Sequence, residues 1–201
     1  MIPKHFIDYY GDQTRWFVGK VVDNNDPKKL GRVKVNVYGV YDDIAPEDLP
    51  WAQIVVPVTQ GVHKSTGQYV GLLVGTNVFG MFLDGPNSQL PLVIGAMPKE
   101  GDDNSLAEEN YPYNKVYETE RGHYKEYDDT EGKERIKERH RSGTHYEMLE
   151  DGTLKIKVMN DCIIEVVNDC NITVKGVTTI DSTKGINLIS GAGVSINGKT
   201  F

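Results

Sequence analysis

The chain has 201 residues, and its 29 Asp and Glu outnumber 22 Lys and Arg to give a formal net charge of −7. This acidic balance argues against a nucleic-acid partner, because contacts with phosphates require a basic surface. Hydrophobic residues make up 38% and charged residues 25% of the chain, which is typical of a folded, soluble protein and excludes a largely disordered one.

Residues 16–97 are predicted to form a small barrel of short strands, after an N-terminal arm at residues 1–15. Val33, Val35 and Val37 alternate with polar residues, which is the period of a half-buried strand. Similar short apolar runs predict strands at Trp16–Val22, Arg32–Tyr38, Ala52–Val58, Gln68–Val74, Asn77–Leu83 and Pro91–Ile94. Residues 45–48 are expected to form a short helical turn. A closed barrel of about five strands leaves no sheet edge exposed.

A polar connector follows at residues 98–114, with the sequence PKEGDDNSLAEENYPYN. Its Tyr-Pro-Tyr segment favours an extended chain. The connector is also too short to hold an inserted domain. We therefore expect residues 115–201 to form a second region directly after this linker.

The second region contains an internal repeat of eight residues. From Leu154 the chain divides into LKIKVMND, CIIEVVND, CNITVKGV, TTIDSTKG, INLISGAG and VSINGKTF. The third position of every unit is apolar, and positions six to eight are rich in Asn, Asp, Gly and Lys, which favour turns. Each unit is predicted to be a short strand with one buried face, followed by a turn. The pattern extends backwards through Tyr146 and Met148, with a turn at residues 150–153.

The short period predicts an assembly of three chains. A single-chain solenoid needs about three strand faces per coil, usually about 18 residues or more, whereas eight residues supply one face. We therefore predict a homotrimer in which three chains wind into an intertwined β-helix with an apolar core. The predicted core residues are Leu154, Ile156, Val158, Cys162, Ile164, Val166, Cys170, Ile172, Val174, Ile180, Ile186, Leu188, Val194 and Ile196. A single-chain β-solenoid or a β-sandwich is the alternative interpretation.

The sequence predicts no catalytic or metal site. Cys162 and Cys170 occupy the first position of their units, so we expect them to pack as small hydrophobic side chains, and no cofactor is predicted. The carboxylates from Glu118 to Glu131 lie among Lys and Arg in a region expected to be solvated, which argues against the paired carboxylates of a glycosidase. The serines lack a nucleophile elbow. We therefore expect a protein that is not an enzyme.

Several short motifs run along the chain in a distinctive order. They are WFVGKVV with Trp16 and Gly19, Asn25-Asp26-Pro27, LGRVKV with Gly31, Leu49-Pro50-Trp51-Ala52, and PLVIG ending at Gly95. In this order they resemble the central spike proteins of contractile injection systems, which include tailed-phage baseplate spikes and the valine-glycine-repeat proteins of type VI secretion. The resemblance implies an all-β protein with an N-terminal OB-type barrel, a connecting β-prism, and a C-terminal triple-stranded β-helix.

The resemblance also implies a structural role in the tail baseplate of a virion assembled in the host cytoplasm. The barrel would dock on a hub ring protein, and the shaft would pierce the bacterial outer envelope, in transient contact with the outer membrane. A PAAR-type tip protein is a candidate partner at the C-terminal end. Some relatives carry a lysozyme domain, for which this connector is too short. Others bind iron through His-x-His pairs, and His5, His63, His123, His140 and His145 form no such pair.

Two other functions stay open at this point. An OB barrel can bind single-stranded nucleic acid through aromatic side chains over a basic groove, and Trp16, Tyr38 and Trp51 are available for this. A glycan-binding fibre on a trimeric stalk would need an aromatic-rich tip, whereas the last unit is rich in Ser, Gly, Asn and Lys. The acidic balance and the repeat favour the spike.

Overall fold

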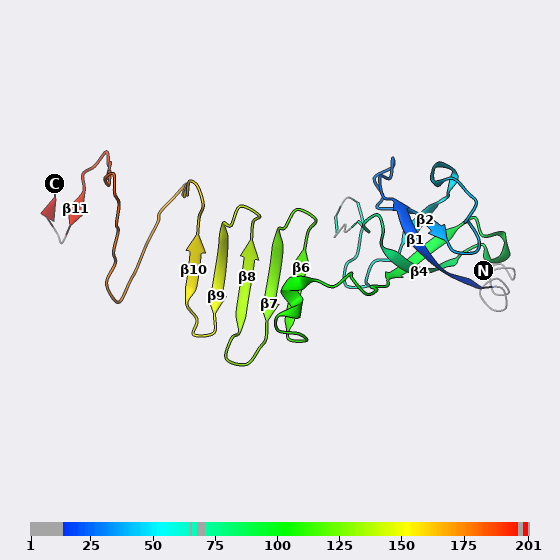
Figure 1. Ribbon diagram of the computed structural model, residues 1–201. Coiled ribbons are helices and arrows are strands. Elements are labelled where there is room, and N and C mark those ends of the chain that lie inside the picture. Colours follow the sequence, from blue (N-terminus) through cyan, green and yellow to red (C-terminus); the bar gives the residue numbers. More distant parts are fainter. Residues whose placement is uncertain (1–13, 65, 68–70, 197–198, 201) are drawn as a thin grey trace. The chain divides into compact units, whose positions relative to one another are not determined.

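A computed structural model gives the fold of residues 14–64, 66–67, 71–196 and 199–200, and the structural statements below concern these residues. The chain divides into two compact units, one up to Lys157 and one from Val158 onward (Figure 1). Nearly all of the regular structure is β-strand, as the sequence predicted. Within the described part of the chain, no helix is both long and apolar enough to cross a membrane.

The first strands close into a five-stranded barrel with the order β1-β2-β3-β5-β4. The strands are β1 (Arg15–Asp23), β2 (Val33–Val37), β3 (Trp51–Ile54), β4 (Asn77–Phe82) and β5 (Pro91–Ala96). All neighbours pair antiparallel except β3 and β5, which are parallel. A short 3-10 helix, η1 (Pro46–Asp48), precedes β3, and η2 (Gly85–Asn87) follows β4. The closed barrel confirms the OB-type prediction.

One predicted barrel strand is absent. Residues 71–74, the described part of the expected strand Gln68–Val74, form loop and turn before β4. Residues 68–70 lie outside the described residues. The segment is apolar enough to resemble a strand, but Gly75 adopts a positive φ of 99° and Thr76 donates its N–H to Leu73 O, so the chain turns here instead of pairing.

The barrel core is built from alternating side chains of its strands. In β1, Phe17, Gly19 and Val21 face inward while Trp16 and Val18 face outward. The buried cluster is Phe17, Val21, Val33, Val35, Val37, Tyr41, Leu49, Ala52, Val78, Phe82 and Val93. At Gly19 a Cβ would lie 2.5 Å from Asn36 O, so only glycine allows β1 and β2 to approach this closely.

A five-stranded antiparallel meander follows the connector. Its strands are β6 (Asn114–Glu118), β7 (Tyr124–Asp128), β8 (Arg135–Arg139), β9 (His145–Leu149) and β10 (Leu154–Lys157), each paired with the next (Figure 1). The connector holds a short helix, α2 (Ser105–Glu108), that the sequence did not predict, and its segment at residues 111–113 forms a turn and not the expected extended chain. Asn104 caps this helix, because its side chain accepts hydrogen bonds from the N–H groups of Leu106 and Ala107.

The second unit carries the eight-residue repeat as a regular series of bends. Bends occur at residues 159–160, 167–168, 175–176, 183–184 and 191–192, always eight residues apart and always at positions six and seven of a unit. Between the bends, residues 158–194 form no strand pairing with any other described part of the chain. Beyond them, β11 (Ser195–Ile196) pairs with β12 (Lys199–Thr200). The predicted turn positions are therefore confirmed, while the triple-stranded pairing stays a prediction.

Candidate assembly surfaces

Asp26 organises the loop between β1 and β2. Its carboxylate accepts hydrogen bonds from the backbone N–H groups of Lys28 at 2.9 Å and Leu30 at 2.9 Å. The Arg32 guanidinium also donates to it, through Nη2 at 2.6 Å and Nε at 3.0 Å. The hydrogen bonds from Arg32 and the backbone hold the pKa of Asp26 far below its ordinary value of 3.8. The Asn-Asp-Pro motif is therefore a loop anchor.

A second part of the motif set packs beside this loop. The Arg32 guanidinium carbon lies 5.5 Å, and Lys34 Nζ 5.2 Å, from the centre of the Trp51 ring. Lys34 is buried and donates to Pro46 O at 3.0 Å and Glu47 O at 2.5 Å. Two cations thus lie within cation–π distance of the Trp51 ring. The structure brings Asp26 and Trp51 into one cluster through Arg32, a residue that the sequence had marked only as part of the LGRVKV segment.

Other predicted motif residues have different surroundings. Gly19, Val33, Val35 and Val37 lie in the barrel interior, and Gly31 has a φ of +73° in the loop that Asp26 anchors. Pro27 and Gly95 are exposed, and Pro50 is half-buried beside Trp51. Trp16 is 55% exposed, so it is a surface residue and not part of the core. The reason is its place in β1, where it alternates with the inward-facing Phe17.

Trp16 belongs to an apolar patch on the outside of the barrel. Its ring stacks on Phe79 with the centroids 5.3 Å apart and an interplanar angle of 7°. Val18 lies opposite Phe79 across β1 and β4, and Tyr38 donates its N–H to Val18 O. We define the barrel patch by five exposed side chains of neighbouring strands and their ends: Trp16, Val18, Tyr38, Phe79 and Ile94. Exposed apolar groups gathered in this way are typical of protein contact surfaces.

The meander β6–β10 has one apolar face. Residues directly opposite one another on paired strands point to the same side of a sheet, so the register defines two rows across this face. The first row runs through Lys115, Tyr127, Ile136, Met148 and Leu154. The second runs through Tyr117, Lys125, Glu138, Tyr146 and Ile156. We call these two rows the apolar face. Its large hydrophobic side chains are 36–69% exposed.

The opposite side of the meander is polar yet less exposed. One row alternates in charge across four strands, through Glu126, Lys137, Glu147 and Lys155. Lys137 Nζ lies 3.9 Å from Glu147 Oε1, and both side chains are less than one-fifth exposed. We call this side the polar face. The usual arrangement of apolar side chains inside and charges outside is therefore inverted in the single chain.

A hydrogen-bonded network anchors the polar face near the connector. Arg135 Nη2 and Asn114 Nδ2 both donate to Glu126 Oε1 at 2.8 Å. Asn110 donates to Asp128 at 2.7 Å. Burial would raise the pKa of Asp128, but hydrogen bonds from Thr130 and Asn110 outweigh it and lower the pKa. Asp128 is therefore buried and structural, which corrects the expectation of a solvated carboxylate.

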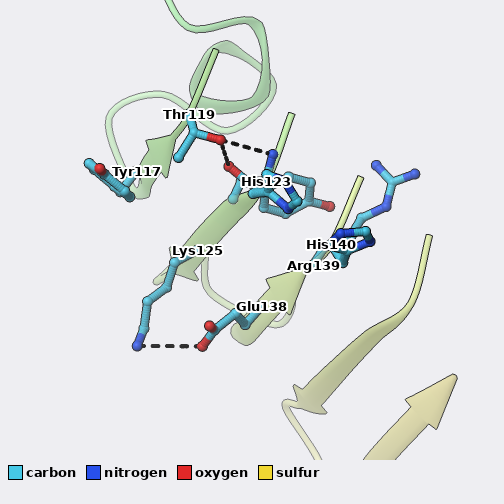
Figure 2. A pocket seen from close by; sticks show the side chains of 8 residues that line it. Tyr117, Thr119, His123, Lys125, Glu138, Arg139 and His140 are labelled. Carbon is cyan, nitrogen blue, oxygen red and sulfur yellow. Dashed lines mark hydrogen bonds and ion pairs between the residues drawn. The ribbon is translucent and has the colours of Figure 1, made fainter. Parts of the chain in front are cut away.

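A small polar cluster interrupts the apolar face. Lys125 Nζ lies 3.6 Å from Glu138 Oε2, and the Tyr146 hydroxyl donates to the same oxygen at 2.7 Å. The hydrogen bond to Glu138 is the main cause of a raised pKa for Tyr146. Figure 2 shows the Lys125 and Glu138 side chains extended toward one another. The charges are thus paired within one chain before any partner covers them.

A pocket at the edge of the meander contains two histidines. It has a volume of about 370 Å³ and is lined by Tyr117, Thr119, His123, Tyr124, Lys125, Glu138, Arg139 and His140 (Figure 2). The centroids of the His123 and His140 rings are 4.5 Å apart. In the part of the chain that the structure describes, no three His, Cys, Asp or Glu side chains come together as a metal site. The two rings instead contact the backbone of a turn.

The predicted trimer-core residues are exposed in the single chain, apart from Val194, which is half-buried. Ile172 is 82% and Ile180 69% exposed, and the thiols of Cys162 and Cys170 are free and exposed. Only β10 holds core residues in a paired strand before the bends begin, and its Leu154 and Ile156 lie on the apolar face. The first eight-residue unit therefore shares its inward positions with the meander, as the backward extension through Tyr146 and Met148 predicted.

The family model of the Gp5 N-terminal OB domain matches residues 31–179, which is more than half of the chain. The chain belongs to this family. The match begins in the loop that Asp26 anchors and extends beyond the barrel into the eight-residue repeat. It therefore joins the barrel, the meander and the start of the repeat in one family assignment.

Two curated relatives are phage proteins. The chain is 38% identical over 88 residues to the pre-baseplate central spike protein Gp5 of Enterobacteria phage T4, covering 39% of this chain and 15% of the relative. It is 25% identical over 264 residues to protein Gp5 of Vibrio phage KVP40, covering 82% of this chain and 62% of the relative. The chain thus spans less than two thirds of either relative. The second alignment is longer than this chain, so it includes residues of the relative without a counterpart here.

Sequence reasoning missed three features of these surfaces. The barrel patch was missed because both sides of the segment Trp16–Val22 carry apolar residues. The sequence therefore does not show which side of β1 faces the solvent. The apolar face of the meander was missed because its strands are rich in charge, although Tyr127, Ile136 and Met148 alternate with charged residues. The buried Glu126 and Asp128 were missed because Asn114, Arg135 and Asn110 contact them from other elements, although Thr130, two residues after Asp128, also donates to it.

Proposed function

We propose that this chain is the structural central spike of a phage tail baseplate, and that it works as a homotrimer. The observation that carries the proposal is the inverted meander, whose apolar face is exposed in the single chain while its polar face is partly buried. Membership in the Gp5 family supports the baseplate location. The spike would be assembled in the host cytoplasm and carried in the virion.

Copies of the same chain are the occupants that fit the apolar face. The face contains Leu154 and Ile156, which are also the first and third positions of the repeat. A partner that covers this face must therefore also contact the apolar positions that recur every eight residues. A second and a third copy of the chain have apolar positions at the same spacing, so they can make this contact in every layer. Three strand faces enclose a core, and each layer adds about 4.8 Å of shaft.

The barrel patch supports docking on another baseplate component. It presents two stacked aromatic rings, Trp16 and Phe79, on strands held by a closed barrel. Rigid aromatic anchors of this kind dominate many protein interfaces. We propose a ring-shaped hub protein as the partner of this surface, with a PAAR-type protein as a further partner of the shaft.

The proposed mechanism is mechanical. A shaft of apolar layers that are covalently continuous within each chain resists shear, so it can breach the outer envelope in transient contact with the bacterial outer membrane. No enzyme activity is required for this. The exposed carboxylates of the connector and meander are paired or solvated, and Asp128 is committed to structural hydrogen bonds. The proposal therefore assigns no catalytic residue and no cofactor.

Light scattering on the full-length chain tests the proposal. We expect a mass near three times 22.5 kDa. Replacing both Ile172→Asp and Ile180→Asp should abolish the trimer, because each layer would then bury three unpaired charges.

The matched control is the pair Ile163→Asp and Ile189→Asp. These side chains are 88% and 94% exposed and occupy the second and fourth positions of their units, which point away from the predicted core. The control should remain trimeric. A monomeric wild-type chain, or equal loss of the trimer in both variants, would contradict the proposed shaft.

A further inference from the structure

Two hairpin turns lie at the same edge of the meander and are joined by histidine side chains. The turn between β6 and β7 ends at His123, and the turn between β8 and β9 runs from His140 to Thr144. Tyr124 and Arg139, the residues next to these histidines, are directly paired across β7 and β8. This pairing places the two imidazole rings side by side, with centroids 4.5 Å apart.

Both rings accept hydrogen bonds from the backbone of the second turn. The Arg141 N–H donates to His123 Nδ1 at 3.4 Å, and the Ser142 N–H donates to His140 Nδ1 at 3.1 Å. A backbone N–H can act only as a donor. Each Nδ1 must therefore keep its lone pair, which fixes both rings as neutral imidazoles with the proton on Nε2. The Ser142 hydroxyl lies 2.8 Å from His140 Nδ1 and donates to Thr144 Oγ1 at 3.4 Å.

We propose that His123 and His140 form an acid-sensitive latch between the two turns. Protonation would place a hydrogen on each Nδ1, against the N–H groups of Arg141 and Ser142, so both hydrogen bonds would be lost. It would also create two positive charges on adjacent rings. The latch is closed while both rings are neutral, and it opens when they are protonated.

The charged groups around the pair reinforce this response. Arg139 and Arg141 flank His140 in the sequence, and both are cationic at every relevant pH. Lys125 and Glu138 also line the pocket, but they pair with each other at 3.6 Å. Glu138 also accepts from Tyr146, so its carboxylate already has two partners of its own.

A third histidine on the same edge provides an internal control. His145 Nδ1 lies 2.8 Å from Gly143 O, and a carbonyl oxygen can only accept, so this nitrogen must carry a proton. His145 Nε2 lies 3.7 Å from Glu147 Oε2. Protonation of His145 therefore breaks no contact and adds an ion pair. The latch and His145 should respond to acid in opposite ways, although they belong to the same turn region.

Hydrogen exchange in the full-length protein tests the latch. We expect the protection factors of the amides at residues 140–143 to fall by about tenfold between pH 8 and pH 5, from the loss of two hydrogen bonds and the new repulsion. Protection factors are used because they divide out the intrinsic dependence of exchange on pH. In His140→Asn and His123→Asn, whose amide oxygens accept an N–H without titrating, the fall should be reduced. His145→Asn should leave it unchanged.

A measurement without any variant guards against misfolding. Nitrogen-15 shifts of labelled imidazoles at pH 8 should show the Nε2–H tautomer for His123 and His140, and a proton on Nδ1 for His145. An Nδ1–H tautomer at either latch histidine would overturn the proposal. So would protection at residues 140–143 that does not change with pH, or an undiminished fall when both latch histidines are replaced.

Discussion

Asp26 receives hydrogen bonds from the N–H groups of Lys28, Leu30 and Arg32 and from the Arg32 guanidinium. The ionised carboxylate, and not the neutral acid, can accept all of these together. The loop between β1 and β2 is consequently built around one negative charge. The pKa of Asp26 lies below the ordinary value of 3.8 chiefly because of the hydrogen bonds from the Arg32 side chain. A carboxylate whose pKa is lowered by folding stabilises the fold above its unfolded pKa, and this contribution is lost as the pH falls further.

Asp26→Asn should therefore lower the melting temperature of the barrel at pH 7 and weaken its dependence on pH below about 4. Tryptophan fluorescence measures this change, because the chain has two tryptophans, Trp16 and Trp51, and both belong to the barrel. Asp23→Asn is the matched control, since Asp23 accepts one exposed hydrogen bond from the Asn25 N–H. Equal pH dependence of the wild type and Asp26→Asn would show that the loop does not depend on this charge.

At the scale of elements, the meander is unusual because its exposed side is the apolar one. The Lys125–Glu138–Tyr146 cluster lies within this apolar face and would be covered in the trimer. Removing one member of a charge pair that becomes buried leaves the other charge unpaired, whereas removing both leaves an apolar surface. The two kinds of change should therefore affect assembly very differently.

We predict that Lys125→Met or Glu138→Met alone weakens the trimer more than the double variant does. The dissociation of the trimer on dilution, followed by light scattering, measures the difference. Lys137→Met, Glu147→Met and their double variant form the control cycle, because this pair lies on the polar face. Single variants that assemble as well as the double variant would indicate that the apolar face stays in contact with water.

Much of the element order could be predicted from local patterns, because alternation and turn residues act over a few positions. The strand β2 was predicted from the alternation of Val33, Val35 and Val37 with polar residues. The bends were predicted from the Asn, Asp and Gly residues of the repeat. The failures were non-local. Gln68–Val74 is apolar like a strand but turns at its end, and Asp128 looked solvated because Asn110 and Arg135 reach it only after folding. The surfaces depend on cross-strand register, which composition alone does not determine.

At the scale of the whole molecule, the two units differ in what encloses their apolar residues. The barrel has its own core within one chain. Among the described residues, 158–194 form no paired strand, so in the proposed trimer their order would depend on association. The two units should therefore unfold with different dependence on protein concentration.

We predict that tenfold dilution lowers the melting temperature of the shaft and leaves that of the barrel unchanged. For a trimer that dissociates into three chains, such a dilution costs about 2.7 kcal per mole of trimer. Circular dichroism follows the shaft together with the barrel, and tryptophan fluorescence follows the barrel alone. Two transitions that are both independent of concentration would indicate a shaft that folds within a single chain.

The eight-residue spacing of the bends limits which insertions and deletions the repeat can accept. An insertion or deletion of eight residues within the repeat adds or removes one layer and leaves every later side chain on its own side. A change of one residue turns all later apolar side chains toward water, because strand side chains alternate. In the proposed shaft, length can therefore change only in steps of one layer, about 4.8 Å each.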